Sequence, residues 1–447
     1  MGMTISPRTV DNPAPAATTR IETGQLRFPG DTLEITGGVP LRGALRVGGA
    51  KNAALPMMAA ALLTDEPVIL ENVPTLEDID VMVQLLQSLG AEVDWQPEQH
   101  RVHIHAHDIS NREASHALVE RMRASFLVSG PVLTRTGEMR TSAPGGCKLG
   151  ARPVDVDLRG FKRMGAEVEI SEQHYAIRAP RLRGAEIFMD YPSHTGTENL
   201  LMAATLARGT TTIVNAASEP EIIALGHMLR EMGARIDGVG TPHIRVNGVE
   251  RLRGVHTTVL PDRLEAGTFA IGAVITGGEV ILNDIDPRDM LPLTSKLTEA
   301  GAEIWWNQGD MLVRAGKRLD ALELQALPFP GFPTDLQAAF AVLLTQAHGS
   351  SRVVERVFND RLRYASELQK MGANMHVTHS QEAWVKGPTP LHGAAVDALD
   401  IRSGACLVLA GLIAEGKTTI GQLQHLRRGY EDIAGKLRGL GATIETR

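Results

Sequence analysis

Hydrophobic positions along the chain follow two alternating patterns. Stretches such as 81–89 place apolar side chains three and four residues apart, as amphipathic helices do, whereas 166–170 alternates apolar and polar residues, as half-buried strands do. A glycine stands between each such helix and the strand after it, and glycine ends helices because it adopts the left-handed conformation at little cost. The pattern predicts an α/β protein in which helices and strands alternate.

A short phrase, Gly-Ala-x-(Val/Ile/Met), repeats six times at intervals of 68 to 75 residues. Its glycines are Gly90, Gly165, Gly233, Gly301, Gly372 and Gly441. Several units also carry, ahead of the phrase, a strand, a helix of small residues and a second strand; these helices are expected at 53–63, 197–207, 266–275 and 403–414. Each unit is therefore predicted to be strand–helix–strand–helix–strand. A unit of about 70 residues buries its faces poorly alone, so we expect two similar α/β domains of three units each.

The domain boundary is predicted near 259–263, between the third and fourth units. We assign 53–261 to the first domain and 30–52 plus 262–447 to the second. The pattern alone leaves open whether 33–45 pairs with the C-terminal half or bridges to it. Residues 1–29, rich in Pro, Thr and Ala, are expected to be a disordered tail. A cleft between two similar domains is a favoured place for a small-molecule site.

Charge and cysteine content narrow the classes of function. The chain has 45 Lys and Arg against 52 Asp and Glu, a net charge of −7, which argues against nucleic acid or an anionic membrane as the main partner. The negative net charge remains compatible with a small anionic substrate that binds in a local basic pocket. Two cysteines cannot make a disulfide framework, the longest apolar run (53–63) is too short to span a bilayer, and no signal-peptide core is present. We therefore expect a cytoplasmic protein without membrane insertion.

Basic residues in turns and at helix starts are candidates for such a pocket. Lys51 and Asn52 follow Gly48-Gly49-Ala50 at a predicted helix start, which is either an anion site or a glycine turn with a solvated lysine. Together with Lys51, five arginines could form one cluster for a doubly anionic substrate, because arginine binds phosphate and carboxylate bidentately. They are Arg123, Arg152, Arg361, Arg402 and Arg428.

Two further residues are candidates for chemistry. Cys147 lies among glycines near Lys148 and Arg152, which favour a thiolate; the alternative is an incidental exposed thiol. Asp335 precedes a predicted helix and is either a helix N-cap or a carboxylate that takes a proton from a substrate hydroxyl. Cys406 lies in an apolar run and is expected in the core.

Two other motifs are interpreted as structural. Residues 411–418 fit the phosphate-loop pattern G-x-x-x-x-G-K-T, but the motif needs a strand followed by a helix, and here the predicted order is reversed. His103, His105 and His107 could share one strand face and hold a metal, but they lack a carboxylate or cysteine companion, so an exposed strand is favoured. We expect no metal and no cofactor.

Several segments together resemble one family, the UDP-N-acetylglucosamine 1-carboxyvinyltransferases among the enolpyruvyl transferases. The segments stand in order over about 33–444: Gly-Gly-Ala-Lys-Asn-Ala-Ala-Leu-Pro at 48–56, Asn-Val-Pro at 72–74, Asp-Ile at 78–79, Met-Arg-Ala-Ser at 122–125, Pro-Gly-Gly-Cys at 144–147, Gly-Ala-Arg-Pro-Val-Asp at 150–155, Leu-Pro-Asp-Arg at 260–263, Phe-Pro-Thr-Asp at 332–335, Asp-Ile-Arg at 400–402 and Arg-Gly-Tyr at 428–430. The resemblance implies two inside-out α/β domains with threefold internal repetition, and an active site between them.

The resemblance also implies a reaction and roles. Enolpyruvyl passes from phosphoenolpyruvate to the 3′-hydroxyl of UDP-N-acetylglucosamine and phosphate is released, which is the first committed step of peptidoglycan synthesis. Asp335 is the base, and Cys147, on a lid loop, is the acid, the site of covalent addition to phosphoenolpyruvate and the target of fosfomycin. The anion-binding and intermediate-binding residues are Lys51, Asn52, Arg123, Arg152, Arg402 and Arg428. The sugar-nucleotide pocket is Arg152, Pro153, Val154, Asp155, Ser193, Asp335 and Val357, with Arg361 near Asp335.

Three other functions remain alternatives. A 3-phosphoshikimate 1-carboxyvinyltransferase shares the fold but lacks the Gly-Gly-Cys loop. An enolpyruvyl transferase for another nucleotide would share the phosphoenolpyruvate machinery and differ in the sugar-nucleotide stretch 191–196. A non-catalytic sugar-nucleotide sensor would not need both Cys147 and Asp335. The resemblance departs at Asp157, where many relatives carry histidine, and in the tail.

Overall fold

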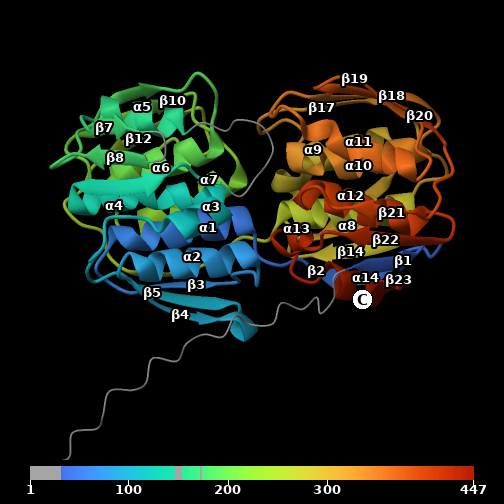
Figure 1. The fold of residues 1–447 in the computed structure, drawn as a ribbon, viewed down its shortest axis with the longest axis horizontal. Helices are drawn as coiled ribbons and strands as arrows, with labels where there is room; N and C mark the ends of the chain where they lie inside the picture. Colours follow the sequence, from blue (N-terminus) through green and yellow to red (C-terminus); the bar gives the residue numbers. More distant parts are fainter. Residues whose placement is uncertain (1–31, 146–153, 172–173) are drawn as a thin grey trace, which may run out of the picture.

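The protein is described here from a computed structural model that covers residues 32–145, 154–171 and 174–447. Two α/β halves lie side by side, with the N-terminal half on the left and the C-terminal half on the right of Figure 1. In each half, helices occupy the middle and small sheets surround them (Figure 1). The predicted α/β class is confirmed, and the predicted tail at 1–29 lies outside the described residues.

The N-terminal half contains three of the sheets found in the described chain. Their strand orders are β13-β3-β5-β4, β6-β8-β7 and β11-β12-β10-β9. The helices are α1 (Lys51–Ala60), α2 (Glu77–Ser88), α3 (His116–Arg121), α4 (Ser129–Thr136), α5 (Asp155–Arg163), α6 (His194–Thr205) and α7 (Pro220–Glu231), with 3-10 turns η1 (Ala61–Leu63), η2 (Pro97–Gln99) and η3 (Arg123–Val128). The strands are β3 (Val68–Glu71), β4 (Glu92–Gln96), β5 (Arg101–His105), β6 (Glu138–Ser142), β7 (Glu167–Ile170), β8 (His174–Arg178), β9 (Glu186–Phe188), β10 (Thr210–Val214), β11 (Arg235–Asp237), β12 (His243–Asn247) and β13 (Val255–Thr258).

The C-terminal half contains three four-stranded sheets. Their orders are β21-β22-β1-β23, β15-β16-β14-β2 and β17-β18-β20-β19. The helices are α8 (Arg263–Ile275), α9 (Pro287–Glu299), α10 (Gln337–Gln346), α11 (Tyr364–Lys370), α12 (Ile401–Ile413), α13 (Gln424–Arg427) and α14 (Ile433–Gly439), with 3-10 turns η4 (Thr334–Leu336) and η5 (Arg361–Arg363). The strands are β1 (Leu33–Thr36), β2 (Arg42–Arg46), β14 (Glu279–Asn283), β15 (Glu303–Asn307), β16 (Asp310–Arg314), β17 (Glu323–Ala326), β18 (Gly349–Glu355), β19 (Met375–His379), β20 (Glu382–Gly387), β21 (Ala395–Asp397), β22 (Lys417–Gly421) and β23 (Thr443–Thr446).

The Gly-Ala phrase has the predicted structural role. All six of its glycines have φ between 92° and 107°, a left-handed conformation that other residues adopt only with strain. The predicted three-stranded unit is too short, however, because the strand after the phrase folds back on a further antiparallel strand, as β4 does on β5. The sixth unit ends at the chain terminus, and β1 takes the missing place by pairing antiparallel with both β22 and β23.

The N-terminal strands join the C-terminal half. β2 pairs parallel with β14, and β13, from the end of the third unit, pairs parallel with β3. Within the described residues, the chain crosses between the halves twice, and the crossings are held together by Ala50 N donating to Leu260 O and Asp262 N donating to Gly48 O, each at 2.8 Å. A side chain at Gly49 would place its Cβ 1.7 Å from the Asn72 carbonyl oxygen, so only glycine fits there.

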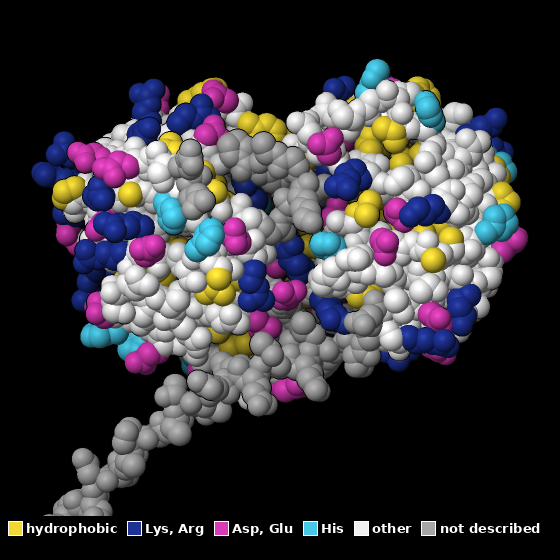
Figure 2. All heavy atoms as spheres, in the orientation of Figure 1, with side chains coloured by type: hydrophobic (Ala, Val, Ile, Leu, Met, Phe, Trp, Pro, Cys, Tyr) yellow, Lys and Arg dark blue, Asp and Glu magenta, His cyan; other side chains and the backbone are white. Residues whose placement is uncertain are grey.

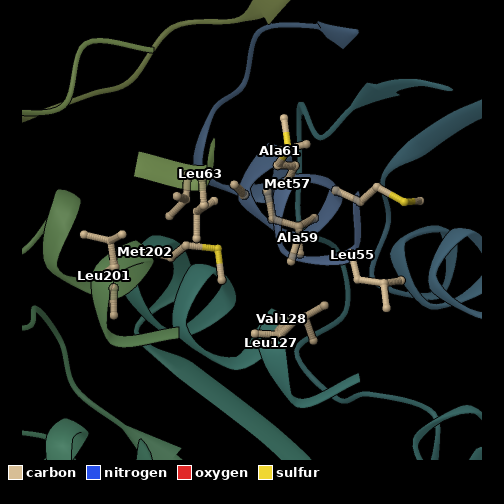
Figure 3. Close-up of a cluster of buried hydrophobic side chains, with 14 of the residues drawn as sticks. Leu55, Met57, Ala59, Ala61, Leu63, Leu127, Val128, Leu201 and Met202 are labelled. Carbon is tan, nitrogen blue, oxygen red and sulfur yellow. The ribbon is translucent and has the colours of Figure 1, made fainter. Parts of the chain in front are cut away.

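Small residues allow the central helices to pack closely. One hydrophobic core runs from Ala50 to Val259, and a second combines Leu33–Val47 with residues 266–444. Figure 3 shows part of the first core, where Leu55 and Met57 of α1 lie with Leu127 and Val128 of η3 and Leu201 and Met202 of α6. Helices α8, α10 and α12 are buried on nearly every side, which is why their sequences are apolar rather than amphipathic.

The segment that resembles a phosphate loop has the predicted order of elements. At 411–418, α12 ends at Ile413, Gly416 has φ +89°, and β22 follows, so the order is helix then strand and no phosphate loop forms. His103 and His105 lie on β5 and are half-buried, and no cluster of three potential metal ligands occurs among the described residues. Cys406 is fully buried in α12, as predicted.

Candidate active site

A cleft of about 780 Å³ lies where the two halves meet, and residues from both halves line it. Figure 2 shows Lys and Arg side chains together with Asp and Glu side chains at this junction. Of the predicted site residues, the cleft collects Lys51, Asn52, Arg123, Ser193, Asp335, Val357, Arg361, Arg402 and Arg428. Chain segments nearly 380 residues apart therefore converge on one cavity.

The first charge cluster in the cleft is centred on Asp78 in the first turn of α2. Lys51 Nζ, at the start of α1, lies 3.0 Å from Asp78 Oδ2, and Arg428 Nε, just after α13, lies 2.8 Å from Asp78 Oδ1. Lys51 Nζ also donates to the Arg428 carbonyl at 3.0 Å. Burial alone would raise the pKa of the Asp78 carboxyl, but Lys51 and Arg428 outweigh it and the pKa is lowered. Lys51 is thus an ion-paired residue, and the solvated-lysine interpretation is wrong.

The second cluster is centred on Asp335 in η4, before α10. Arg361 Nη1 lies 2.9 Å from Asp335 Oδ1, and Arg402 Nε donates to the same oxygen. Burial would raise the pKa of this carboxyl, but Arg402 and Arg361 hold it well below its usual range. Asp335 does not cap α10, since neither η4 nor α10 has a side-chain cap, so the N-cap interpretation is wrong.

Glu355 and Phe358 fix the Arg361 side chain of this second cluster. Glu355 accepts from Thr334 Oγ1 at 2.7 Å and from the Val357 amide at 2.7 Å, and Arg361 Nη1 donates to Thr334 Oγ1 at 2.9 Å. The Arg361 guanidinium also stacks on the Phe358 ring at 4.4 Å. Its Nε and Nη2 atoms are buried and lack a hydrogen-bond partner among the described residues. The side chain is therefore held in place by Thr334, Asp335 and Phe358.

Some predicted site residues lie elsewhere. Val154 lines a small cavity next to the cleft together with Arg123, and the Asp155 carboxylate pairs with Arg159 at 3.0 Å on the surface of α5. The structure therefore does not bring Val154 and Asp155 into the cleft. Cys147, Arg152 and Pro153 lie outside the described residues, as does the loop expected to be a lid.

Asp157 lies behind Arg123. It lines the same small cavity, of about 10 Å³, and accepts from Asn199 Nδ2 at 2.9 Å. Asn199 Oδ1 in turn accepts from Gly130 N at 2.7 Å, which fixes the orientation of the amide. Burial raises the pKa of Asp157 to about 6. At this position many relatives are expected to carry histidine. This chain instead has a buried carboxyl group near Arg123, a candidate binding residue.

Several residues in the cleft or directly behind it were missed by the sequence reasoning. Asp78 and Glu355 hold candidate catalytic or binding cations, Arg263 pairs with Glu221 at 3.0 Å, and His194 faces Glu198. Asp78 lies in one of the segments that resemble the family. An acidic residue in the first turn of a helix, however, is ordinarily explained by its favourable interaction with the helix dipole, so no functional role was inferred for it. The pairing partners lie up to 350 residues away, so no local pattern could have found them.

The comparison with known proteins places most of the chain in one family. Residues 35–437 match the model of the family described as EPSP synthase (3-phosphoshikimate 1-carboxyvinyltransferase). A UDP-N-acetylglucosamine 1-carboxyvinyltransferase 2 of Carboxydothermus hydrogenoformans is 49% identical over 413 residues, which is 92% of this chain and 98% of the relative. A UDP-N-acetylglucosamine 1-carboxyvinyltransferase of Koribacter versatilis is 48% identical over 417 residues, covering 93% and 96%. The chain belongs to the UDP-N-acetylglucosamine 1-carboxyvinyltransferase family.

Solved structures agree with this family on the fold. The enolpyruvyl transferase NikO from Streptomyces tendae superimposes with a TM-score of 0.84 at 26% identity and covers 93% of this chain and 99% of its own. An EPSP synthase from Acinetobacter baumannii, at 20% identity, has a TM-score of 0.72 and shows the shared fold alone. The predicted enolpyruvyl transferase fold is confirmed. Within the described residues, no helix is long and apolar enough to cross a membrane.

Proposed function

We propose that this protein transfers the enolpyruvyl group of phosphoenolpyruvate to the 3′-hydroxyl of UDP-N-acetylglucosamine and releases phosphate, in the first committed step of peptidoglycan synthesis. The observation that carries the proposal is that two carboxylate-centred cation clusters, at Asp78 and at Asp335, line one cleft in a chain of this family. Phosphoenolpyruvate carries a phosphate and a carboxylate, and two separated sets of cations suit such a doubly anionic substrate. Transfer without a cofactor needs a base, an acid and charge stabilisation.

Asp335 is the proposed base. A carboxylate held by two arginines is a weak base, because those cations stabilise its charged form. Phosphoenolpyruvate binding would supply a competing anion for Arg402, and Asp335 would then regain basicity next to the acceptor hydroxyl. This coupling ties activation of the base to the presence of the substrate. Arg361 stays behind Asp335 because Thr334 and Phe358 fix it.

The reaction proceeds by addition and elimination. In the addition, the acceptor hydroxyl oxygen forms a bond to C2 of phosphoenolpyruvate, Asp335 takes the hydroxyl proton, and Cys147 gives a proton to C3, which becomes a methyl group. In the elimination, the methyl group returns a proton to the Cys147 thiolate that the addition left, and the C2–O bond to phosphate breaks with its electron pair leaving on phosphate, which gives an enolpyruvyl ether. The acid role of Cys147, and its covalent adduct with phosphoenolpyruvate, are proposals from the family resemblance.

The remaining site residues are proposed to bind the two substrates. Lys51, Asn52, Arg123, Arg152, Arg402 and Arg428 are proposed to hold the anionic groups and the intermediate by positioning and electrostatics. The sugar nucleotide is proposed to contact Arg152, Pro153, Val154, Asp155, Ser193, Asp335, Val357 and Arg361. For Val154 and Asp155 to take part, the segment before α5 would have to approach the ligand when it binds.

The domain division is also a proposal, in which 53–261 forms one domain and 30–52 with 262–447 the other. It is supported by the two separate hydrophobic cores and by the pairing of β1 and β2 with strands of the C-terminal half. The substrates are small metabolites of the cytoplasm, so we propose that the protein works there.

Phosphate release from phosphoenolpyruvate tests the function, with UDP-N-acetylglucosamine, shikimate 3-phosphate and UMP as parallel acceptors. Release only with UDP-N-acetylglucosamine supports the proposal. Release with another acceptor would keep the mechanism and change the substrate. If the protein binds UDP-N-acetylglucosamine but releases no phosphate with any of the three acceptors, a sensor is favoured and the catalytic roles are contradicted.

A further inference from the structure

A buried ion pair joins the two halves beside the point where the chain crosses between them. Glu221 lies in the first turn of α7 in the N-terminal half, and Arg263 is the first residue of α8 in the C-terminal half. Arg263 Nε donates to Glu221 Oε1 at 3.0 Å and Nη2 donates to Oε2 at 3.3 Å, so the contact is bidentate. The Glu221 side chain is 1% exposed and that of Arg263 is 10% exposed. The pair is therefore almost completely enclosed at the junction.

Both partners keep their charge in this enclosed position. Burial would raise the pKa of the Glu221 carboxyl, but contacts led by Arg263 outweigh burial and the pKa is lowered. Burial would lower the pKa of Arg263, but contacts led by the Glu221 carboxylate outweigh burial and the pKa is raised. A bidentate contact between a guanidinium and a carboxylate fixes the distance and the relative orientation of its partners. The pair thus holds α7 and α8 in one mutual arrangement.

Arg263 is also connected to the crossing and to the segment before Asp335. The preceding residue, Asp262, caps α8 with its side chain, and its N–H donates to Gly48 O of the other crossing at 2.8 Å. The Arg263 guanidinium lies over the Phe329 ring, 5.5 Å from the ring centroid. Phe329 lines the cleft shortly before Asp335 in the chain. Through Arg263, the pair therefore links α7 of one half to the cleft wall of the other half.

Another ion pair across the junction, between Asp78 and Arg428, has a different surrounding. It belongs to the first charge cluster of the cleft, where a substrate anion would compete with the carboxylate for the cation under the proposed function. Glu221, by contrast, lies behind the cleft wall rather than in it, so a substrate cannot take its place at Arg263. The Glu221–Arg263 contact can therefore persist while the contacts of the cleft change.

We propose that Glu221 and Arg263 are positioning residues whose ion pair fixes the angle between the two halves. That angle sets the relative placement of the two cation clusters, which are centred on carboxylates in different halves, Asp78 and Asp335. A buried ion pair adds little net stability, because the cost of removing two charges from water offsets their attraction, and well-packed apolar residues often stabilise as well. What the bidentate pair contributes here is a defined geometry between α7 and α8.

Replacing the ion pair by apolar residues separates positioning from stability. In Glu221→Leu/Arg263→Met neither charge of the pair is left buried alone, so the melting temperature should stay close to that of wild type. Small-angle X-ray scattering of the unliganded variant should give a larger radius of gyration than that of wild type. With phosphoenolpyruvate and UDP-N-acetylglucosamine, kcat/KM should fall about a hundredfold, which is the loss expected when reacting groups are misplaced by about 1 Å.

Two further variants complete the experiment. Arg263→Lys keeps the positive charge and loses the bidentate geometry, so it should show the same two changes to a smaller extent. Glu250→Leu/Arg181→Met is the matched control, because it removes an exposed ion pair of 3.1 Å that lies within the N-terminal half. The control should have the scattering and the kcat/KM of wild type.

Wild-type scattering or wild-type kcat/KM in folded Glu221→Leu/Arg263→Met would overturn the inference. If that variant does not fold, wild-type scattering and kcat/KM in Arg263→Lys would overturn it. The activity measurement rests on the proposed function, whereas the scattering measurement does not. A larger radius of gyration in the variant, together with a wild type that releases no phosphate, would therefore support the inference and contradict the proposed function alone.

Discussion

Arg428 and Asp78 form an ion pair between the two halves of the protein. Arg428 Nε lies 2.8 Å from Asp78 Oδ1, and the two residues are 350 positions apart in the chain. Lys51 binds the other carboxylate oxygen at 3.0 Å, so one buried carboxylate holds two cations at the cleft. Asp335 does the same with Arg361 and Arg402. Under the proposed function, a substrate anion would compete with these two carboxylates for the same cations.

Removing the Asp78 carboxylate should destabilise the protein in a way that anions reverse. Asp78→Asn leaves Lys51 and Arg428 close together without their counter-charge. We expect a loss of about 2 kcal/mol in the free energy of unfolding, less than for a fully buried pair because both cations keep some solvent contact. Added inorganic phosphate should raise the melting temperature of Asp78→Asn more than that of the wild type.

Asp80→Asn is the control for this prediction. Asp80 lies on the same helix, but it accepts from the Trp95 indole rather than from cleft cations. Phosphate should not stabilise this variant more than it stabilises the wild type. Equal phosphate effects on Asp78→Asn and wild type would show that Asp78 does not occupy an anion site.

Loss of the Asp335 carboxylate should abolish proton removal while leaving acceptor binding. Asp335→Asn is expected to lower kcat at least about a hundredfold, the range found for a general base, with the dissociation constant for UDP-N-acetylglucosamine within about threefold of wild type. Steady-state kinetics and calorimetry measure the two quantities. Asp320→Asn, a surface carboxylate in the same half, should behave as wild type. Turnover near the wild-type rate would remove Asp335 from the base role.

Stability should depend on pH through Glu198. Burial raises its folded-state pKa from 4.5 to about 8, so the native state keeps a proton that the unfolded state loses between these values. The unfolded state then binds fewer protons, and wild-type stability falls as the pH rises through this window. Glu198→Gln cannot lose that proton, so its melting temperature relative to wild type should rise from pH 4.5 to pH 8.

Glu250→Gln, an exposed residue, serves as the control for the Glu198 measurement, and its melting-temperature difference from wild type should not vary with pH. A difference between Glu198→Gln and wild type that stays constant from acid to alkaline pH would contradict a strongly raised pKa for Glu198.

Cys147 should be the residue that fosfomycin alkylates. The epoxide of fosfomycin mimics phosphoenolpyruvate, and a thiolate near cationic groups is the nucleophile that would open it. Peptide mass spectrometry after incubation with UDP-N-acetylglucosamine should find the adduct on the Cys147 peptide and leave the fully buried Cys406 unmodified. If the Cys147 peptide stays unmodified in catalytically active protein, Cys147 is not the reactive thiol.

The repeats made much of the fold predictable from the sequence. Each Gly-Ala phrase encodes a helix end and a strand start, and the positive φ of all six glycines shows why the signal is strong. Apart from the strand expected at His103 and His105, the last strand of the first five units escaped prediction, because its alternation is short and the turn before it varies. The sequence could not decide which half β1 joins. Leu33 pairs with Ile420 and Thr446 because β1 takes the place of the further strand that the sixth unit lacks, and no local pattern indicates this.

The sequence predicted which residues belong to the site, but it did not predict how they pair with one another. Motif segments identified Lys51, Asp335, Arg402 and Arg428, and the structure gathers them in one cleft. Their partners Asp78 and Glu355 were missed because an acidic residue on a helix or at a strand end has an ordinary local explanation. The low pKa of Asp335 is likewise invisible in the sequence, because two arginines 26 and 67 residues away cause it.

Identification of the reaction product tests the central proposal most directly. The protein would be incubated with phosphoenolpyruvate and UDP-N-acetylglucosamine, and the mixture analysed by mass spectrometry and phosphorus NMR. We expect a sugar nucleotide that carries an enolpyruvyl ether, formed in equal amount with inorganic phosphate by the wild type and only in traces by Asp335→Asn. Unchanged UDP-N-acetylglucosamine and intact phosphoenolpyruvate with folded wild-type protein would contradict the proposed transfer.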